Sequence, residues 1–314
     1  MIDYSFIMDF LFMWIRVATP ILLTSLGAVI CERTGVVNLG LDGIMLIAAL
    51  FGVLGSAWGG NLFWGTVAGI GAALIVSGVF AYFHLILKAN AVLCGTAVNT
   101  IAGGLTVFVL QLATGEKGSS SSLKSFSFPA VSIPIIKDIP VLGDILSGHN
   151  VITYFAFFMV IVISVFLYRT PMGLRMRAVG ENPSAASSVG QNVTKIRFLA
   201  ILLCGVMAGM GGMYLSMGYL SMFTRDMVAG RGFIALAACA MGQANPVGAL
   251  ISSMVFSFFD GLSNILQLLQ IPSEFVQMLP YGATILGLTI YSIQKQRQKN
   301  KKNKEILQNV IRQR

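Results

Sequence analysis

The chain has 314 residues, of which 56% are hydrophobic and only 11% are charged, and its mean hydropathy is +0.81. Soluble globular domains carry about 25% charged residues, so this composition excludes an ordinary soluble protein and indicates an integral membrane protein. The formal net charge is +9, but beyond Tyr291 the tail alone carries eight Lys and Arg against Glu305. We expect this tail to lie on the cytoplasmic side and to attract anionic lipid rather than nucleic acid.

Repeated apolar runs of about 20 residues, separated by glycine, proline and charged breaks, predict helices that cross a membrane. The runs show no period-two alternation, and backbone polar groups in lipid must be satisfied within the segment, so helices are expected rather than strands. The expected spans are 10–30, 44–58, 66–87, 92–113, 151–168, 198–219, the short run 233–241, 247–269 and 275–291. We therefore predict an all-α, polytopic membrane helix bundle of about nine spans, in a range of about eight to ten, some of them broken. One transmembrane domain covers 1–294, and the basic cytoplasmic tail covers 295–314.

The loop 114–150 is the longest stretch without an apolar run, and its charges cancel. Because basic residues gather in cytoplasmic loops, this neutral loop is placed on the outer face, with the N-terminus outside and the tail inside. Arg225 and Arg231 fall in a second loop that this topology also places outside, and Asp226 offsets only one of them. These two arginines count against the assignment.

A polar stretch at about 174–197 separates two strongly apolar runs and predicts a short helix with clear signals at both ends. Asn182 suits an N-cap, Pro183 fits the first helical position and Gly190 stands just past the end. The interior residues are small, and a helix so short needs a surface to pack against. Flanking basic residues place the stretch on the cytoplasmic side, where it is either an ordinary loop or a docking knob for a soluble partner.

Five polar residues inside the predicted bundle are candidates for lining a substrate pathway, because such side chains are costly in lipid and usually face the interior. Asn38 and Asp42 lie four apart around the start of the second span, where capping and a pathway role are both open. Asp260 and Asn264 repeat this spacing in a later span, with less reason to act as caps. Asn99 stands in a glycine-containing helix, where a single amide often makes a helix–helix hydrogen bond.

The chain has no G-x-x-x-x-G-K-[ST] phosphate cradle, no His/Glu metal motif and no nucleophile elbow, so no cofactor is expected on it. Its four cysteines are scattered through apolar segments and are expected to be small buried hydrophobes. The apolar pattern is interrupted at 243–246 and around Pro280, and such breaks at membrane depth are typical of a transport route. A transporter of this composition takes its energy from another polypeptide or from an ion gradient.

Three blocks of the sequence carry a resemblance. They read GAVICERTGVVNLGLDGIMLIAA at 27–49, RAVGENPSAASSVGQNVTKIR at 177–197 and AGRGFIALAACAMGQANPVGAL at 229–250. They resemble the N-terminal signature, the cytoplasmic coupling segment and the GRGFIALA block of the permease subunits of ATP-binding-cassette (ABC) importers, in the branched-chain amino acid, ribose and nucleoside group. Within that group the first and third blocks are most similar to the nucleoside permeases.

The resemblance implies a type II ABC importer-like permease that moves nucleosides across the bacterial cytoplasmic membrane by alternating access. The implied partners are a different, longer permease subunit, an ATPase subunit that binds ATP and Mg²⁺, and an extracytoplasmic substrate-binding lipoprotein, with membrane lipid around the bundle and no nucleic acid. The resemblance assigns ATPase coupling to the following residues: Gly180, Glu181, Asn182, Pro183, Ser184, Ala185, Ala186 and Gly190.

Two alternatives stay open at this point. The first is a permease of the same type for a sugar or a branched-chain amino acid. The second is an ion-coupled secondary transporter, which needs buried ionisable groups, and Asp42 and Asp260 are the evident candidates for these.

Overall fold

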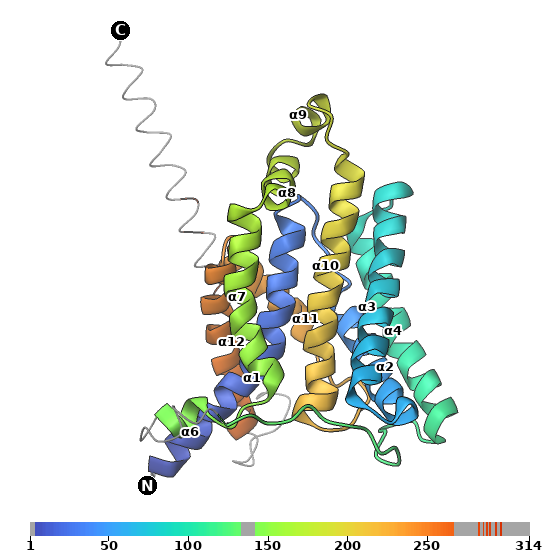
Figure 1. Ribbon diagram of the computed structural model, residues 1–314, viewed down its shortest axis with the longest axis vertical. Helices are drawn as coiled ribbons and strands as arrows, with labels where there is room; N and C mark the ends of the chain where they lie inside the picture. The colour runs from blue at the N-terminus through green and yellow to red at the C-terminus, as the bar shows by residue number, and fades with distance from the viewer. Residues whose placement is uncertain are drawn as a thin grey trace.

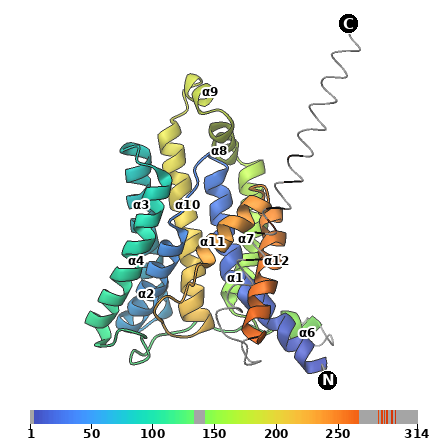
Figure 2. The ribbon, with the colours of Figure 1, turned by 180° about the vertical axis from the view of Figure 1, so that it is seen from behind.

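A computed structural model describes residues 4–132 and 142–266, together with the single helical positions Gly282, Ile285, Gly287, Thr289, Ile293 and Gln296. The described part of the chain is almost entirely helical and contains two isolated β-bridges but no strand. The helices run roughly side by side in one bundle, with α9 at one end and the N-terminus at the other (Figures 1 and 2). The predicted all-α class is confirmed.

The elements follow one another as α-helices, with two short π-helical turns, η1 and η2, that extend α3 and α10. Their bounds are α1 (Tyr4–Glu32), α2 (Leu41–Gly59), α3 (Leu62–Ala81), η1 (Tyr82–Ile86), α4 (Ala91–Thr114), α6 (Leu142–Leu146), α7 (Val151–Arg169), α8 (Pro171–Glu181), α9 (Pro183–Ser188), α10 (Val193–Met213), η2 (Tyr214–Tyr219), α11 (Arg231–Met241) and α12 (Pro246–Leu266).

Within the described residues, seven helices are long and apolar enough to cross a membrane, and α11 is a shorter apolar helix. These eight helices follow the order of the first eight predicted spans, while the predicted span 275–291 lies outside the described residues. The sequence reading missed α8, which is too polar to register as a span. It also placed the start of α10 five residues late, because the polar first turn is capped by Asn192 and precedes the apolar run.

The bundle has a densely packed centre, and α10 shows why. Gly212 lies directly against the backbone of Met45 in α2, and Gly205 lies against the side chain of Ser77 in α3. A side chain at either glycine would overlap its neighbour, so these two positions let the helix backbones approach closely. By contrast, much of α3, α4 and α7 is exposed and apolar, as expected for helices that face lipid.

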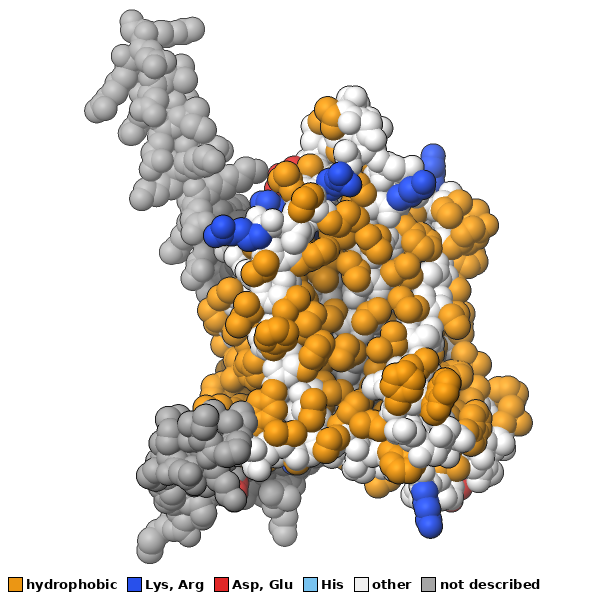
Figure 3. Space-filling model, in the orientation of Figure 1, with side chains coloured by type: hydrophobic (Ala, Val, Ile, Leu, Met, Phe, Trp, Pro, Cys, Tyr) orange, Lys and Arg blue, Asp and Glu red, His pale blue; other side chains and the backbone are white. Residues whose placement is uncertain are grey.

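The two ends of the bundle differ in charge. On the face seen in Figure 3, most Lys and Arg side chains gather around the α8–α9 end, and an apolar band covers the middle. The loop that follows α4 runs across the opposite end (Figure 1), where the amide of Phe128 donates to the carbonyl of Met217 at 2.8 Å. The outer loop and the 174–197 stretch therefore lie at opposite ends, as the sequence predicted, and the basic end is the cytoplasmic one by the positive-inside rule.

Helix α2 begins inside the bundle rather than at its end. Asn99 of α4 hydrogen-bonds the backbone of Gly43 and lies eight residues past the start of α4, which corresponds to about 12 Å of helix. Between Glu32 and Leu41 the chain is not continuous helix. Residues 33–40 therefore return into the bundle as irregular backbone, and Asn38 and Gly40 are buried in protein, whereas Gly35 and Val37 are exposed. Irregular backbone at membrane depth is tolerated only where protein buries it or where it lines a cavity.

Candidate functional site

The stretch at 174–197 folds as two helices that project from the cytoplasmic end (Figure 1). Asn182 caps α9 as predicted, because its Oδ1 accepts a hydrogen bond from the amide of Ala185 at 3.1 Å. Pro183 occupies the first helical position, and Gly190 follows the helix with a φ of +80°, a conformation that glycine adopts without strain. The predicted short helix and its two end signals are confirmed.

The coupling residues separate into a buried and an exposed group. Ala186 is only 5% exposed and belongs to the hydrophobic core, and Gly180 lies against the backbone of Arg33 and Gly35. Most of the others are exposed, and Val189, which the sequence reading did not select, is 75% exposed. The exposed residues among the predicted set are Glu181, Asn182, Ser184, Ala185 and Gly190.

Two of the predicted pathway residues support the irregular segment before α2. Asn38 is buried, and its Oδ1 accepts a hydrogen bond from the amide of Gly40 at 3.0 Å. Asn99 accepts from the amide of Gly43 at 2.8 Å and donates to the carbonyl of Leu39 at 3.0 Å. Both amides thus satisfy backbone groups that no helix satisfies. Asn99 makes the helix–helix hydrogen bond considered for it, whereas Asn38 is not the cap of α2, whose N-cap is Gly40. A pathway role for them stays a prediction.

Asp42 joins the starts of two helices. It lies in the first turn of α2, and its Oδ1 accepts a hydrogen bond from the amide of Gly232, in the first turn of α11, at 3.0 Å. The N-terminus of a helix carries a partial positive charge, so two N-termini that meet inside the bundle favour a carboxylate between them. Capping, one of the two predicted alternatives, is therefore an observed role of Asp42, although the helix it caps is α11.

Asp260 has a cationic partner. The guanidinium of Arg231 forms an ion pair with its carboxylate, with Nη2 and Nε each 3.1 Å from Oδ2, and both side chains are largely buried. Arg231 counted against the predicted topology because basic residues are unusual on the outer side. The ion pair removes this objection, since the charge of Arg231 is neutralised within the bundle. The backbone of Arg225, the second such residue, pairs with Gly118 of the outer loop. Asn264 lies in α12, and its side chain is outside the described part of the structure.

The structure therefore brings three of the five predicted pathway residues into one line of contacts. Asn99 supports the start of α2, Asp42 connects that start to Gly232, and the preceding residue, Arg231, pairs with Asp260. We name this set of contacts the α2–α11 junction. The junction unites the first and third blocks of the sequence, which are almost 200 residues apart.

Sequence reasoning missed Arg16, a half-buried residue within the first predicted span. Its guanidinium lies over the ring of Tyr219, 4.8 Å from the centroid, toward the outer end of the bundle. A single arginine inside an apolar run is itself a signal, because an ionisable residue at membrane depth is rarely retained without a partner. The partner of Arg16 could not be predicted from the sequence, because Tyr219 belongs to η2 and is 203 residues away.

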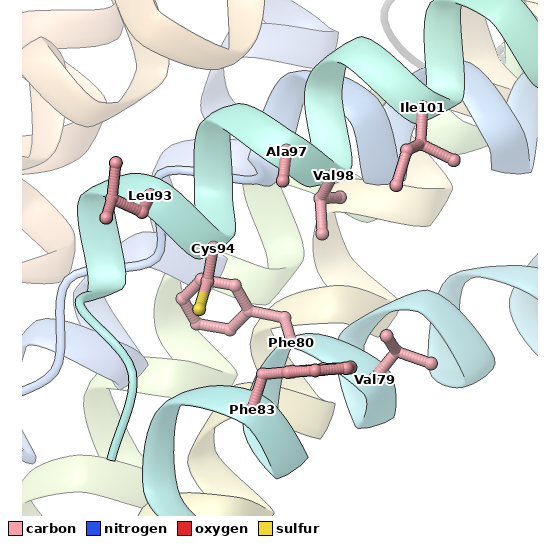
Figure 4. A pocket seen from close by; sticks show the side chains of 8 residues that line it. All are labelled: Val79, Phe80, Phe83, Leu93, Cys94, Ala97, Val98 and Ile101. Atoms are coloured by element: carbon pink, nitrogen blue, oxygen red, sulfur yellow. The ribbon is translucent and has the colours of Figure 1, made fainter. Parts of the chain in front are cut away.

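A pocket of about 270 Å³ lies between α3, η1 and α4 (Figure 4). Its lining is entirely apolar and consists of Val79, Phe80, Phe83, Leu93, Cys94, Ala97, Val98 and Ile101. None of the predicted pathway residues lines it. A solute rich in hydroxyl groups would leave them unpaired there, so this pocket is unsuited to a polar substrate.

Within the described ranges 4–132 and 142–266, seven apolar helices of spanning length, together with α2 and α11, whose starts meet inside the bundle, define a multi-pass membrane protein of transporter type. The family model described as the permease component of the branched-chain amino acid transport system matches residues 10–288. The chain belongs to this family of permease subunits.

Relatives support this membership over most of the chain. NupQ of Bacillus subtilis, a guanosine ABC transporter permease, is 38% identical over 87% of this chain and 88% of its own length. NupC of Lactococcus lactis, a nucleoside ABC transporter permease, is 34% identical over 87% and 89%. TsgC13 of Haloferax volcanii, whose name refers to glucose, is 34% identical over 79% and 74%. The first two organisms each have a second matching permease, NupP and NupB. The present chain is thus a multi-pass permease subunit of the bacterial cell membrane.

Proposed function

We propose that this chain is the membrane subunit of an ABC importer that carries nucleosides into the cell. The observation that carries the proposal is its 38% identity to a guanosine permease over nearly the full length of both chains. A second nucleoside permease, at 34% identity, supports the same substrate class. Translocation proceeds by alternating access, with the tightly packed helices moving as bodies around the α2–α11 junction.

The proposal places the energy source on a partner chain. The α8–α9 pair projects from the basic end of the bundle, and α9 offers exposed small residues to a cytoplasmic ATPase that binds ATP and Mg²⁺. A second permease subunit, of a different and longer type, completes the pathway. The pairs of matching permeases in two organisms support such a partner. An extracytoplasmic lipoprotein delivers the nucleoside to the outer face.

Two alternatives have some support. A sugar permease of the same type is favoured by the 34% identity to TsgC13, and a branched-chain amino acid by the family's description. An ion-coupled carrier needs free ionisable groups, but Asp42 is engaged by an amide and Asp260 by Arg231. We therefore place the ion-coupled carrier last.

The test is transport by the complete complex, purified with every chain that associates with this one and reconstituted in liposomes. We expect uptake of labelled guanosine to require ATP, to survive an ionophore that collapses ion gradients, and to be inhibited by unlabelled nucleosides. Glucose and leucine in excess serve as matched competitors and are expected to have no effect. Uptake that needs no ATP and is lost with the ionophore would overturn the ABC mechanism. Inhibition by glucose or leucine would overturn the assignment of nucleosides as the substrate.

A further inference from the structure

The stretch 32–42, which runs from the last residue of α1 through the irregular backbone to the second residue of α2, holds both ends of α11. It leaves α1 at the cytoplasmic end and enters α2 inside the bundle. Helix α11 has 11 residues and hence a length of about 16 Å, and its start and its end each contact this stretch. We name the stretch the 32–42 clasp.

At the C-terminal end of α11, the clasp binds through Arg33. Its Nε donates to the carbonyl of Ala244 at 2.6 Å, and its Nη2 donates to the carbonyl of Gln243 at 3.3 Å. Gln243 and Ala244 have φ values of +58° and +50°, which residues other than glycine rarely adopt. The planar guanidinium of Arg33 can donate to both of these carbonyls at once. They lie just past the C-terminus of α11, where the helix dipole also favours positive charge.

At the N-terminal end of α11, the clasp binds through Asp42. Besides the hydrogen bond to the amide of Gly232, the two backbones are in direct contact, since a Cβ on Gly232 would lie 2.5 Å from the amide nitrogen of Asp42. A carboxylate at the start of α11 and a guanidinium at its end complement both poles of the helix dipole. The clasp therefore carries α11 as one body.

The same clasp lies against the coupling segment. Gly180 of α8 has no room for a side chain beside the backbone of Arg33 and Gly35, and Arg197 of α10 donates from Nε to the carbonyl of Thr34 at 3.0 Å. A movement of α8 relative to the bundle must therefore displace the start of the clasp. The contact of Gly180 is between backbones and cannot yield by rotation of a side chain, whereas that of Arg197 is made by its side chain.

We propose that Arg33 and Asp42 are positioning residues that make α11 follow the coupling segment, so that the motion reaches the Arg231–Asp260 ion pair at the start of α11. The inference rests on the proposed function, because it supplies the route between the ATPase and the pathway. Arg33 transfers the displacement to the end of α11, and Asp42 keeps its start in register with α2. Neither residue needs to touch the nucleoside.

The test compares uptake with ATP hydrolysis in the complete reconstituted complex. We expect Arg33→Gln to assemble and hydrolyse ATP while guanosine uptake falls about ten- to hundredfold, the range of typical coupling between sites. Arg33→Lys keeps the charge but loses the fork, so a partial recovery is expected. The matched control is Arg169→Gln, an exposed arginine at the same end of the bundle, which should keep the wild-type ratio of nucleoside imported to ATP hydrolysed.

Asp42→Asn provides a second, nearly isosteric variant in case Arg33→Gln does not assemble. The substituted side chain keeps an oxygen that can accept from the amide of Gly232 and loses only the negative charge, so we expect a smaller loss of uptake per ATP. Asp226→Asn, at an exposed carboxylate, should behave as the wild type. Assembled Arg33 and Asp42 variants that import guanosine at the wild-type ratio would overturn the inference, as would hydrolysis and uptake that fall in equal proportion. A wild-type complex without ATP-dependent nucleoside uptake would instead overturn the proposed function, and the inference with it.

Discussion

The α9 helix and the α2–α11 junction are built in opposite ways. Helix α9 has six residues, and its cap is local. Asn182 and Ala185, which form the capping hydrogen bond, are three positions apart in the chain. In the junction, Asp42 binds Gly232 across 190 positions, and Arg231 pairs with Asp260 on another helix. A local unit can present a surface to another protein and be displaced without unfolding, whereas a long-range junction can respond only as part of the bundle.

The largest effect is expected from a charge placed on the exposed face of α9. Ala185→Arg should abolish association with the ATPase while leaving the stability of the permease unchanged, because Ala185 is exposed. Association is measured by co-purification, and stability by the thermal midpoint in detergent. Ala130→Arg, the same change at an exposed position of the outer loop, is the matched control and should not affect association.

Ala186→Arg is not equivalent to this variant, although the sequence made the two positions look interchangeable. Ala186 is buried, so an arginine there would displace α9 itself before any partner binds. Normal ATPase association of the Ala185→Arg permease would contradict the coupling role of α9 and favour an ordinary cytoplasmic loop.

The next largest effect is expected at the junction. Arg231→Gln leaves the carboxylate of Asp260 without its cation in a largely buried site, and such a loss costs about 3 kcal/mol of stability. The thermal midpoint of the permease should fall accordingly. The double variant Arg231→Gln with Asp260→Asn removes the unpaired charge and should recover part of the loss. If the double variant were as unstable as the sum of both single variants, the two residues would not act as a pair.

A smaller effect is expected from the cap of α9. Asn182→Ala removes the acceptor for the amide of Ala185 and should destabilise the short helix by about 1 kcal/mol. Hydrogen exchange at residues 185–188 should therefore accelerate. Asn192→Ala removes the equivalent cap of α10, whose amide partner is Lys195, and is the matched control. Since α10 is anchored by buried residues, only its first turn should respond. Equal exchange throughout both helices would show that α9 is not a local unit.

The smallest effect concerns the outer end, away from both regions. His149 is buried, its ring stacks on Phe12 with 4.1 Å between centroids, and its Nε2 lies 2.7 Å from the carbonyl oxygen of Ile145. Burial disfavours the cation and lowers the pKa of His149 below the ordinary value of 6.5, with Arg16 adding to the shift. The unfolded chain then binds the proton more readily than the folded one, so stability is lost as the pH falls below 6.5.

This pH dependence is measured by hydrogen exchange at the amide of Val131, which donates to the carbonyl of His149 at 2.9 Å. Its protection, corrected for the intrinsic pH dependence of exchange, should decrease between pH 7.5 and pH 5.5. His149→Phe keeps an aromatic ring against Phe12 and cannot titrate, so its corrected protection should be independent of pH. A wild-type protein with pH-independent protection would show that His149 does not control the packing of this loop.

The sequence alone determined the features that depend on local composition. The apolar runs indicated the seven described helices of spanning length and the shorter α11 in order, and the residue types at 182, 183 and 190 located α9 and both its ends. These features were predictable because the membrane imposes a length on each helix and because capping acts within a few residues. The polar helix α8 escaped prediction because it is not an apolar run, although Thr170 as its N-cap and Pro171 at its first position gave the same kind of local signal as in α9.

Only the tertiary structure decided what the polar residues do. Asp42 and Asp260 were recognisable as costly residues, but their partners, Gly232 and Arg231, follow from how the chain packs rather than from helical spacing. The start of α2 inside the bundle and the hydrogen bonds of Arg33 to the carbonyls of Gln243 and Ala244 were hidden for the same physical reason. A polar group in lipid must find a partner somewhere, and which partner it finds depends on which helices meet.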